Sequence, residues 1–141
     1  RRKGWDVLLE AYWRAFSVED NVRLRFRSFV HQSNLLFKEA DGDLNKRIAE
    51  FATSKFGKPR EELAAVEWVG DAEDKRGNLL TRSELRDELA GADAFVLPTR
   101  GEGWGLPVAE AMTMGLPTIV SNWSGPTAFA TPETAYLLPV A

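Results

Sequence analysis

The spacing of apolar residues predicts a helix near the start of the chain. Apolar side chains recur there at intervals of three and four residues; they are Trp5, Leu8, Leu9, Tyr12, Trp13 and Phe16. Because an α-helix has 3.6 residues per turn, this spacing places all of them on one face. An amphipathic helix is therefore expected over residues 5–17, with its aromatic side chains in the core.

A period of two follows from Val22 to Val30. Leu24 and Phe26 alternate there with Arg23, Arg25 and Arg27. Successive side chains of a strand point to opposite faces, so the alternation predicts a strand with one solvated face. A surface for an anionic partner or membrane is the alternative interpretation of the arginines, and the solvated face is preferred.

The rest of the chain alternates between helical and extended patterns. Helices are expected over residues 44–56, from a capping-box sequence at Thr81–Glu84 to about residue 90, and over residues 107–114. Short apolar runs predict strands; their sequences are AVEWVGD, DAFVLPT (expected to be buried), LPTIVSN and TAYLLPV. Strands that alternate with helices form parallel sheets covered on both faces. The predicted class is α/β, with a Rossmann-like, doubly wound, mainly parallel sheet.

Composition narrows the possible functions. The chain has 141 residues, the length of one domain, and no apolar run long enough to span a bilayer. Its net charge of -3 argues against a nucleic-acid partner, because such proteins neutralise phosphates with basic residues. The absence of cysteine and the single histidine, His31, exclude disulfides and metal sites built from thiolates or several histidines. A cytoplasmic location is expected, and the start at Arg1 suggests a piece of a longer protein.

The candidate chemistry lies in the stretch RGEGWGLPVAEAM, residues 100–112. Gly101, Gly103 and Gly105 alternate with other residues between a predicted strand and a predicted helix. In parallel sheets, ligands bind beyond the carboxyl ends of the strands. Glycines let a ligand approach the backbone, and the free N–H groups of the first helical turn attract phosphate. The loop is therefore a candidate phosphate-binding site.

Two carboxylates flank this loop. Glu110, inside the predicted helix, offers two acceptor oxygens that suit neighbouring sugar hydroxyls, and Glu102 on the loop can reach groups beyond the phosphates. The GxGxG spacing matches neither the Rossmann nor the Walker pattern. On loop chemistry alone, a tight strand-to-helix turn with a solvated Glu110 explains the residues equally well.

The stretch RGEGWGLPVAEAMTMGLPTIVSNWSG resembles the signature segment of retaining GT-B glycosyltransferases of the family 4-like group, the glycosyl transferases group 1. The hallmark of that segment is two glutamates separated by seven residues, here Glu102 and Glu110. ADAFVLPT and KGWDVLLEAY also resemble the family's donor domain, whereas the likeness is diffuse over residues 20–60. The resemblance implies that residues 1–141 are the C-terminal, nucleotide-sugar-binding half of a GT-B fold, truncated at its N-terminus.

The resemblance also implies roles for individual residues. Glu110 would hold the ribose hydroxyls, while Glu102 and Lys3, as catalytic residues, would lie at the transferred sugar and the diphosphate. The backbone of four loop residues would meet the sugar and phosphates: Gly103, Trp104, Gly105 and Leu106. Val69 and Gly70, at the end of a strand, would lie near the base.

Substrates and partners follow from the same resemblance. The donor would be a nucleotide sugar such as UDP-glucose or GDP-mannose, and no cofactor or metal is expected, because positive charge and a helix dipole stabilise the leaving diphosphate. The acceptor would bind to an N-terminal domain outside this chain, and the full-length protein could contact a membrane peripherally. The arginine that normally assists Lys3 would also lie upstream. The isolated chain is therefore expected to bind nucleotide weakly and to transfer little or no sugar.

Other interpretations fit parts of the sequence. A glycoside hydrolase would use Glu102 and Glu110 as paired carboxylates, about 5–9.5 Å apart and normally on separate elements. A non-catalytic nucleotide-sugar module or degenerate partner subunit would keep the same donor site. Asp41–Asp43 is similar to a metal-binding DxD or a calcium loop, but capping of the next helix by Asp43 is preferred. Ser124 and Gly125 are expected to help shape the donor cleft.

Overall fold

The computed structural model describes residues 2–27, 44–69 and 80–140. The chain divides into two compact units, one of Arg1–Leu9 with Leu80–Ala141 and the other of Glu10–Leu79. The first helix, α1 (Trp5–Ala15), contributes residues to both units. The positions His31, Asp41–Asp43 and Gly70 lie outside the described residues.

The unit of Glu10–Leu79 contains one parallel strand pair and the helix α3 (Leu44–Phe56). Strand β1 (Arg23–Arg27) pairs with β2 (Ala65–Val69), and the short 3-10 helix η1 (Arg60–Glu62) precedes β2. The core of this unit is formed by apolar side chains from α1, α3 and the segment that leads into β2; they are Tyr12, Trp13, Ile48, Ala52, Leu63, Ala64 and Val66.

The aromatic side chains of α1 differ in their burial. Tyr12 and Trp13 are buried as expected, and each donates a hydrogen bond to a backbone carbonyl: the Tyr12 hydroxyl to Ala65 (2.9 Å) and the Trp13 indole to Ala64 (3.0 Å). The expectation of a core position for Phe16 was wrong, because α1 ends at Ala15 and the Phe16 side chain is 41% exposed.

The alternating strand has the predicted solvated face. Arg23, Arg25 and Arg27 are exposed, whereas the residues between them are partly buried. The Glu67 carboxylate on the neighbouring strand lies 3.5 Å from both Arg23 and Arg25. Cross-strand charge pairing thus accompanies exposure on this face.

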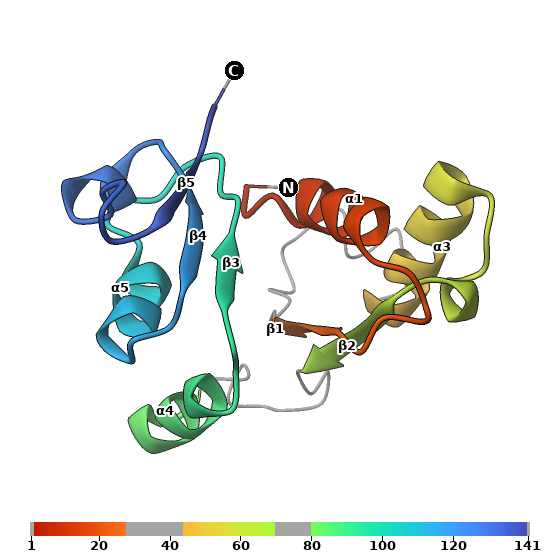
Figure 1. Cartoon of the computed structure of the whole chain (residues 1–141), viewed down its shortest axis with the longest axis horizontal. Coiled ribbons are helices and arrows are strands. Elements are labelled where there is room, and N and C mark those ends of the chain that lie inside the picture. The colour runs from red at the N-terminus through yellow and green to blue at the C-terminus, as the bar shows by residue number, and fades with distance from the viewer. Residues whose placement is uncertain (1, 28–43, 70–79, 141) are drawn as a thin grey trace. The chain divides into compact units, whose positions relative to one another are not determined.

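The unit of Arg1–Leu9 with Leu80–Ala141 contains a three-stranded parallel sheet. Its strands, in the order β3 (Phe95–Leu97), β4 (Thr118–Ser121) and β5 (Tyr136–Leu138), lie next to one another (Figure 1). Helix α5 (Leu106–Thr113) packs against β3 and β4, and its Val108 is fully buried with Val120 of β4. Helix α4 (Arg82–Ala90) and the 3-10 helix η2 (Gly125–Ala128) complete the unit.

Most predicted elements are confirmed. Helix α3 has the expected bounds, and α4 begins with the predicted capping box, in which Thr81 Oγ1 accepts from the Glu84 amide (3.3 Å) and the Thr81 amide donates to the Glu84 carboxylate (2.7 Å). Strand β3 is only partly buried, because it lies at the edge of the described sheet. Every strand pair in the described residues is parallel, and the strands alternate with helices, so the α/β, Rossmann-like class is confirmed.

Candidate functional site

The glycine loop connects the carboxyl end of β3 to α5, as the sequence predicts. Gly105 caps the helix with φ = 92°, a conformation that residues with a side chain rarely adopt. A Cβ at this position would lie 2.8 Å from the Pro126 ring, so the loop also packs too closely there for a larger residue. Pro107 occupies the first turn of α5, where its missing N–H group costs little.

The segment before α1 is bound to the residues that follow β3. The Arg100 amide donates to the Arg2 carbonyl at 2.8 Å, and the Thr99 hydroxyl oxygen lies 3.3 Å from the same carbonyl oxygen. The Arg100 guanidinium forms a bidentate pair with Asp6, at 2.9 and 3.2 Å. Burial alone would raise the pKa of Asp6, but the hydrogen bond and charge of Arg100 lower it. These contacts fix the start of the chain beside the glycine loop.

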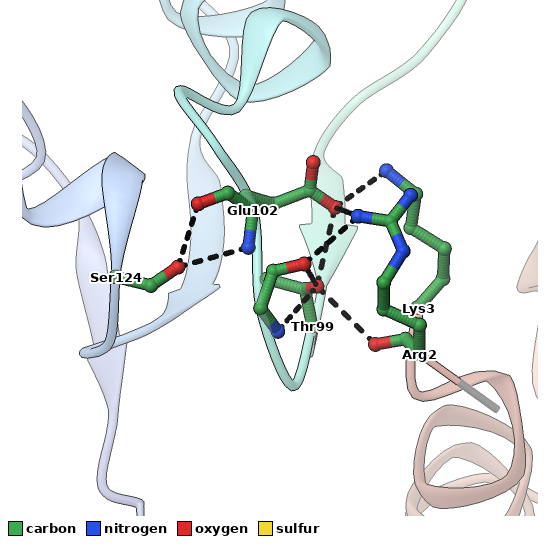
Figure 2. A network of polar contacts seen from close by, with 6 residues as sticks. Arg2, Lys3, Thr99, Glu102 and Ser124 are labelled. Carbon is green, nitrogen blue, oxygen red and sulfur yellow. Dashed lines mark hydrogen bonds and ion pairs between the residues drawn. The ribbon is translucent and has the colours of Figure 1, made fainter.

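Glu102 is the centre of a charged network (Figure 2). Its Oε1 accepts from Lys3 Nζ at 2.5 Å and from Thr99 Oγ1 at 3.2 Å, and Arg2 Nη1 lies 3.5 Å away. The Glu102 side chain is only 8% exposed. Burial would raise the pKa of Glu102, yet Lys3, followed by Thr99 and Arg2, lowers it below its usual value. Glu102 is therefore an anion at neutral pH in spite of its burial.

The backbone of Glu102 is held from another side. Its amide donates to Ser124 Oγ at 2.8 Å, and Ser124 Oγ donates to its carbonyl, also at 2.8 Å. The Gly125 amide donates to the same carbonyl at 3.1 Å. The residues near β4 thus determine where the loop lies.

The loop residues that follow Glu102 have unused donors, and three of the four are accessible. Gly103, Trp104 and Leu106 are exposed, whereas Gly105 is buried. The centroid of the Trp104 ring lies 5.3 Å from that of the Phe129 ring. Within the described residues, four consecutive amides donate no hydrogen bond: those of Gly103, Trp104, Gly105 and Leu106. Such amides at a helix N-terminus can bind an anion.

The other predicted site residues are placed as follows. Glu110 is exposed on α5, and its carboxylate makes no hydrogen bond or ion pair with another described residue. Val69 is the last residue of β2, in the unit of Glu10–Leu79, and Gly70 is outside the described residues. The proposed roles of these three residues stay predictions.

Sequence patterns did not identify two members of the network. Arg2 and Thr99 were not predicted as site residues, although both contact Glu102. Two features of the sequence could have identified them. Arg2 is the neighbour of Lys3, and Thr99 lies at the end of the stretch DAFVLPT, just before the glycine loop. In the described ranges, no group of three or more acidic, histidine or cysteine side chains is arranged to hold a metal ion. No helix in these ranges is both long and apolar enough to cross a bilayer.

The fold and the loop define an α/β protein with a candidate anion-binding site at the carboxyl end of a parallel strand. The whole chain, residues 1–141, matches the family model of the glycosyl transferases group 1. The chain therefore belongs to this family, which confirms the resemblance seen in the sequence and supports the predicted enzyme class, a glycosyltransferase.

Two similar proteins each match this chain over only part of their own length. The UDP-Gal:alpha-D-GlcNAc-diphosphoundecaprenol alpha-1,3-galactosyltransferase of Escherichia coli is 46% identical over 44 residues, which are 31% of this chain and 11% of that enzyme. A solved structure described as the crystal structure of the GtfA/B complex has 17% sequence identity and a TM-score of 0.40. That likeness covers 84% of this chain and 25% of the other. The matches thus span a quarter or less of these two proteins.

Proposed function

We propose that this chain is the donor-binding domain of a glycosyltransferase and binds a nucleotide diphosphate sugar. The observation that carries the proposal is the row of free amides over Gly103–Leu106 beside the cationic groups that surround Glu102. Amides and cations together suit a diphosphate, because each supplies donors to phosphate oxygens.

In the network around Glu102, the positive charge exceeds the negative charge. Arg2 and Lys3 both contact the single carboxylate of Glu102, which leaves one positive charge uncompensated. Lys3 is 44% exposed, and its ammonium has three donors, of which Glu102 uses one. Lys3 can therefore contact a diphosphate while it stays paired with Glu102.

The two glutamates receive different roles in this proposal. Glu102 is buried, ionised and fixed, so its carboxylate offers acceptors to the hydroxyls of the transferred sugar. Glu110 is exposed and unpaired within the described residues, which suits the capture of two ribose hydroxyls. Lys3 and the N-terminus of α5 stabilise the charge of the leaving diphosphate, and transfer proceeds with retention and without a metal.

Glycoside hydrolysis with Glu102 as the proton donor is disfavoured by the ionisation of this carboxyl. A hydrolase needs one carboxylic acid with a raised pKa to protonate the leaving group. The pKa of Glu102 is instead lowered, because Lys3, Thr99 and Arg2 outweigh the effect of burial. A carboxylate in this environment holds a substrate better than it donates a proton.

The proposal places the acceptor substrate outside this chain. It would bind to a separate domain of the full-length protein, and the transfer reaction would take place between the two. The relative from Escherichia coli is named as an enzyme that uses UDP-Gal, so UDP-galactose is a suitable first donor to test beside UDP-glucose and GDP-mannose.

Calorimetric titration of the chain with UDP, GDP and these three nucleotide sugars tests the proposal. At least one nucleotide is expected to bind, and Glu110→Ala is expected to weaken it about tenfold or more, since a hydrogen bond to a charged group contributes about 1.5–3 kcal/mol. Glu61→Ala, an exposed glutamate in the other unit, is the matched control and should bind as the parent does. Failure of all five ligands to bind would refute the proposed function.

A further inference from the structure

Ser124 has a backbone conformation that favours glycine. Its φ of 59° and ψ of −148° lie at the border of a region that residues with a Cβ rarely enter. Among the described residues, Ser124 is the one non-glycine residue with positive φ. A serine persists in such a conformation when surrounding contacts hold it there.

The contacts of the Ser124 side chain are made to Glu102, whereas the Ser124 carbonyl accepts from Thr127. The single hydroxyl of Ser124 accepts from the Glu102 amide and donates to the Glu102 carbonyl, both at 2.8 Å. The hydroxyl therefore satisfies both polar backbone groups of one loop residue. A glycine at position 124 would adopt the same torsions without strain but could make neither bond.

The turn that contains Ser124 also packs directly on the loop. A Cβ at Gly125 would overlap the Gly103 carbonyl, so the two backbones are in close contact. The Gly125 amide adds a third hydrogen bond to the Glu102 carbonyl, at 3.1 Å. The fixed region thus extends from Glu102 to Gly103, the first of the residues with free amides.

The side chain and the backbone of Glu102 are held by different groups. Figure 2 shows Ser124 on one side of Glu102 and Lys3 with Arg2 on the other. Both cations contact the carboxylate, and Arg2 also donates to the carbonyl of the preceding residue, Gly101, at 2.9 Å. The amide and the carbonyl of Glu102 itself are instead bound by Ser124, with the Gly125 amide as a second donor to the carbonyl.

We propose that Ser124 is a positioning residue, whose hydroxyl holds the Glu102 backbone so that the carboxylate meets the sugar of the donor. This inference rests on the proposed function of the loop. It predicts that the loss of the hydroxyl affects recognition of the sugar more than recognition of the nucleotide, because Glu110 and Lys3 stay in place.

The variants Ser124→Gly and Ser124→Ala separate positioning from folding. Ser124→Gly removes both hydrogen bonds and the strain, so its urea midpoint is expected to stay close to that of the parent. Its affinity for the nucleotide sugar that binds the parent is expected to fall about threefold to tenfold, with a smaller change for the matching nucleotide diphosphate. Exchange of the Glu102 amide hydrogen, followed by NMR, should become about tenfold faster.

Ser124→Ala keeps the strain and loses the bonds, so the same loss of sugar recognition should come with a lower urea midpoint. Thr113→Ala is the matched control: its hydroxyl also donates to a backbone carbonyl, that of Ala109 at 2.7 Å, but has no contact with Glu102. This control should leave both the Glu102 exchange rate and the affinities unchanged.

Two results would overturn the inference. One is parent-like exchange at Glu102 in Ser124→Gly, and the other is an equal loss of affinity for nucleotide sugar and nucleotide diphosphate. If the parent binds no nucleotide, the proposed function fails by itself, and the exchange rate of Glu102 still decides whether Ser124 fixes the loop.

Discussion

The ammonium of Lys3 lies 2.5 Å from Oε1 of Glu102, so two residues separated by 99 positions in the sequence form one ion pair. The family resemblance assigns them to different parts of the donor, the diphosphate and the sugar. In the structure they contact each other directly. Lys3 therefore helps to keep Glu102 ionised, and the contact fixes the two side chains relative to each other.

Replacement of Lys3 by alanine is expected to damage both the site and the fold. Glu102, 8% exposed, would keep only Arg2 as a cationic neighbour, at 3.5 Å. The pKa of Glu102 should rise, because burial would no longer be outweighed by Lys3. We expect a loss of about 1–2 kcal/mol in the free energy of unfolding, since Lys3 is partly exposed and solvent screens the pair. NMR titration of the Glu102 carboxyl and urea unfolding measure the two effects.

Lys55→Ala is the matched control for this prediction. Lys55 also pairs with a glutamate, Glu10 at 3.4 Å, but both side chains of that pair are more than 30% exposed, with 51% for Lys55 and 31% for Glu10. Its loss should lower the free energy of unfolding less than the loss of Lys3 does, because solvent screens this pair more strongly. Lys3→Ala should also weaken nucleotide binding, whereas Lys55→Ala should not. Equal effects of the two substitutions would contradict the importance of the Lys3–Glu102 pair.

The stability of the protein should depend on pH through the ionisation of the Glu102 carboxyl. The pKa of Glu102 lies below its usual value of 4.5 in the folded protein, so the unfolded chain takes up this proton more readily. The stabilisation by Glu102 is therefore fully present above pH 4.5 and is lost as the pH falls through the folded pKa. Urea midpoints between about pH 7 and about pH 3 should decrease in this acidic window.

Glu102→Gln removes the titrating carboxyl, so the urea midpoint of this variant should decrease less steeply in acid than that of the parent. The variant is expected to be less stable than the parent at neutral pH, and the two curves should converge in acid. Glu67→Gln, which removes a more exposed carboxylate 3.5 Å from two arginines, should leave the acidic slope closer to that of the parent. A parent-like slope in Glu102→Gln would mean that the network does not stabilise the fold.

Local patterns predicted the elements well. Helix α3 has the bounds that its apolar spacing indicated, and the Thr81–Glu84 capping box begins α4. These features depend on residues three or four positions apart, which a sequence shows directly. The glycine loop was located for the same reason, since it follows a strand and precedes a helix.

Contacts between distant segments could not be predicted from these patterns. The pairing of Lys3 with Glu102 and the hydrogen bonds of Ser124 to Glu102 depend on how the segments meet in space. The partial burial of β3 likewise depends on its place at the edge of the described sheet. The sequence thus indicated Lys3 and Glu102 as candidates, whereas Arg2 and Thr99 and the arrangement of the network required the structure.

Gly4 provides a further test of how Lys3 is positioned. Gly4 is buried, has φ = 70°, and lies so close to Pro98 that a Cβ would overlap the Pro98 carbonyl. Gly4→Ala should therefore force the backbone of residues 3–5 away from the end of β3. The free energy of unfolding is expected to fall by about 2–4 kcal/mol, because the strained backbone conformation and the clash with Pro98 both destabilise the folded state. Urea unfolding measures this cost, and nucleotide titration should show weaker binding because Lys3 is displaced.

Gly57→Ala separates the two contributions. Gly57 has a similar φ of 64°, but no atom lies within 4 Å of a Cβ built there. Its substitution by alanine should lower the free energy of unfolding by about 1–2 kcal/mol, the strain of a left-handed conformation alone. The difference between the two variants then measures the close approach of Gly4 to Pro98. If Gly4→Ala costs no more than Gly57→Ala, the turn that carries Lys3 can move away from β3, and the donor site does not depend on that contact.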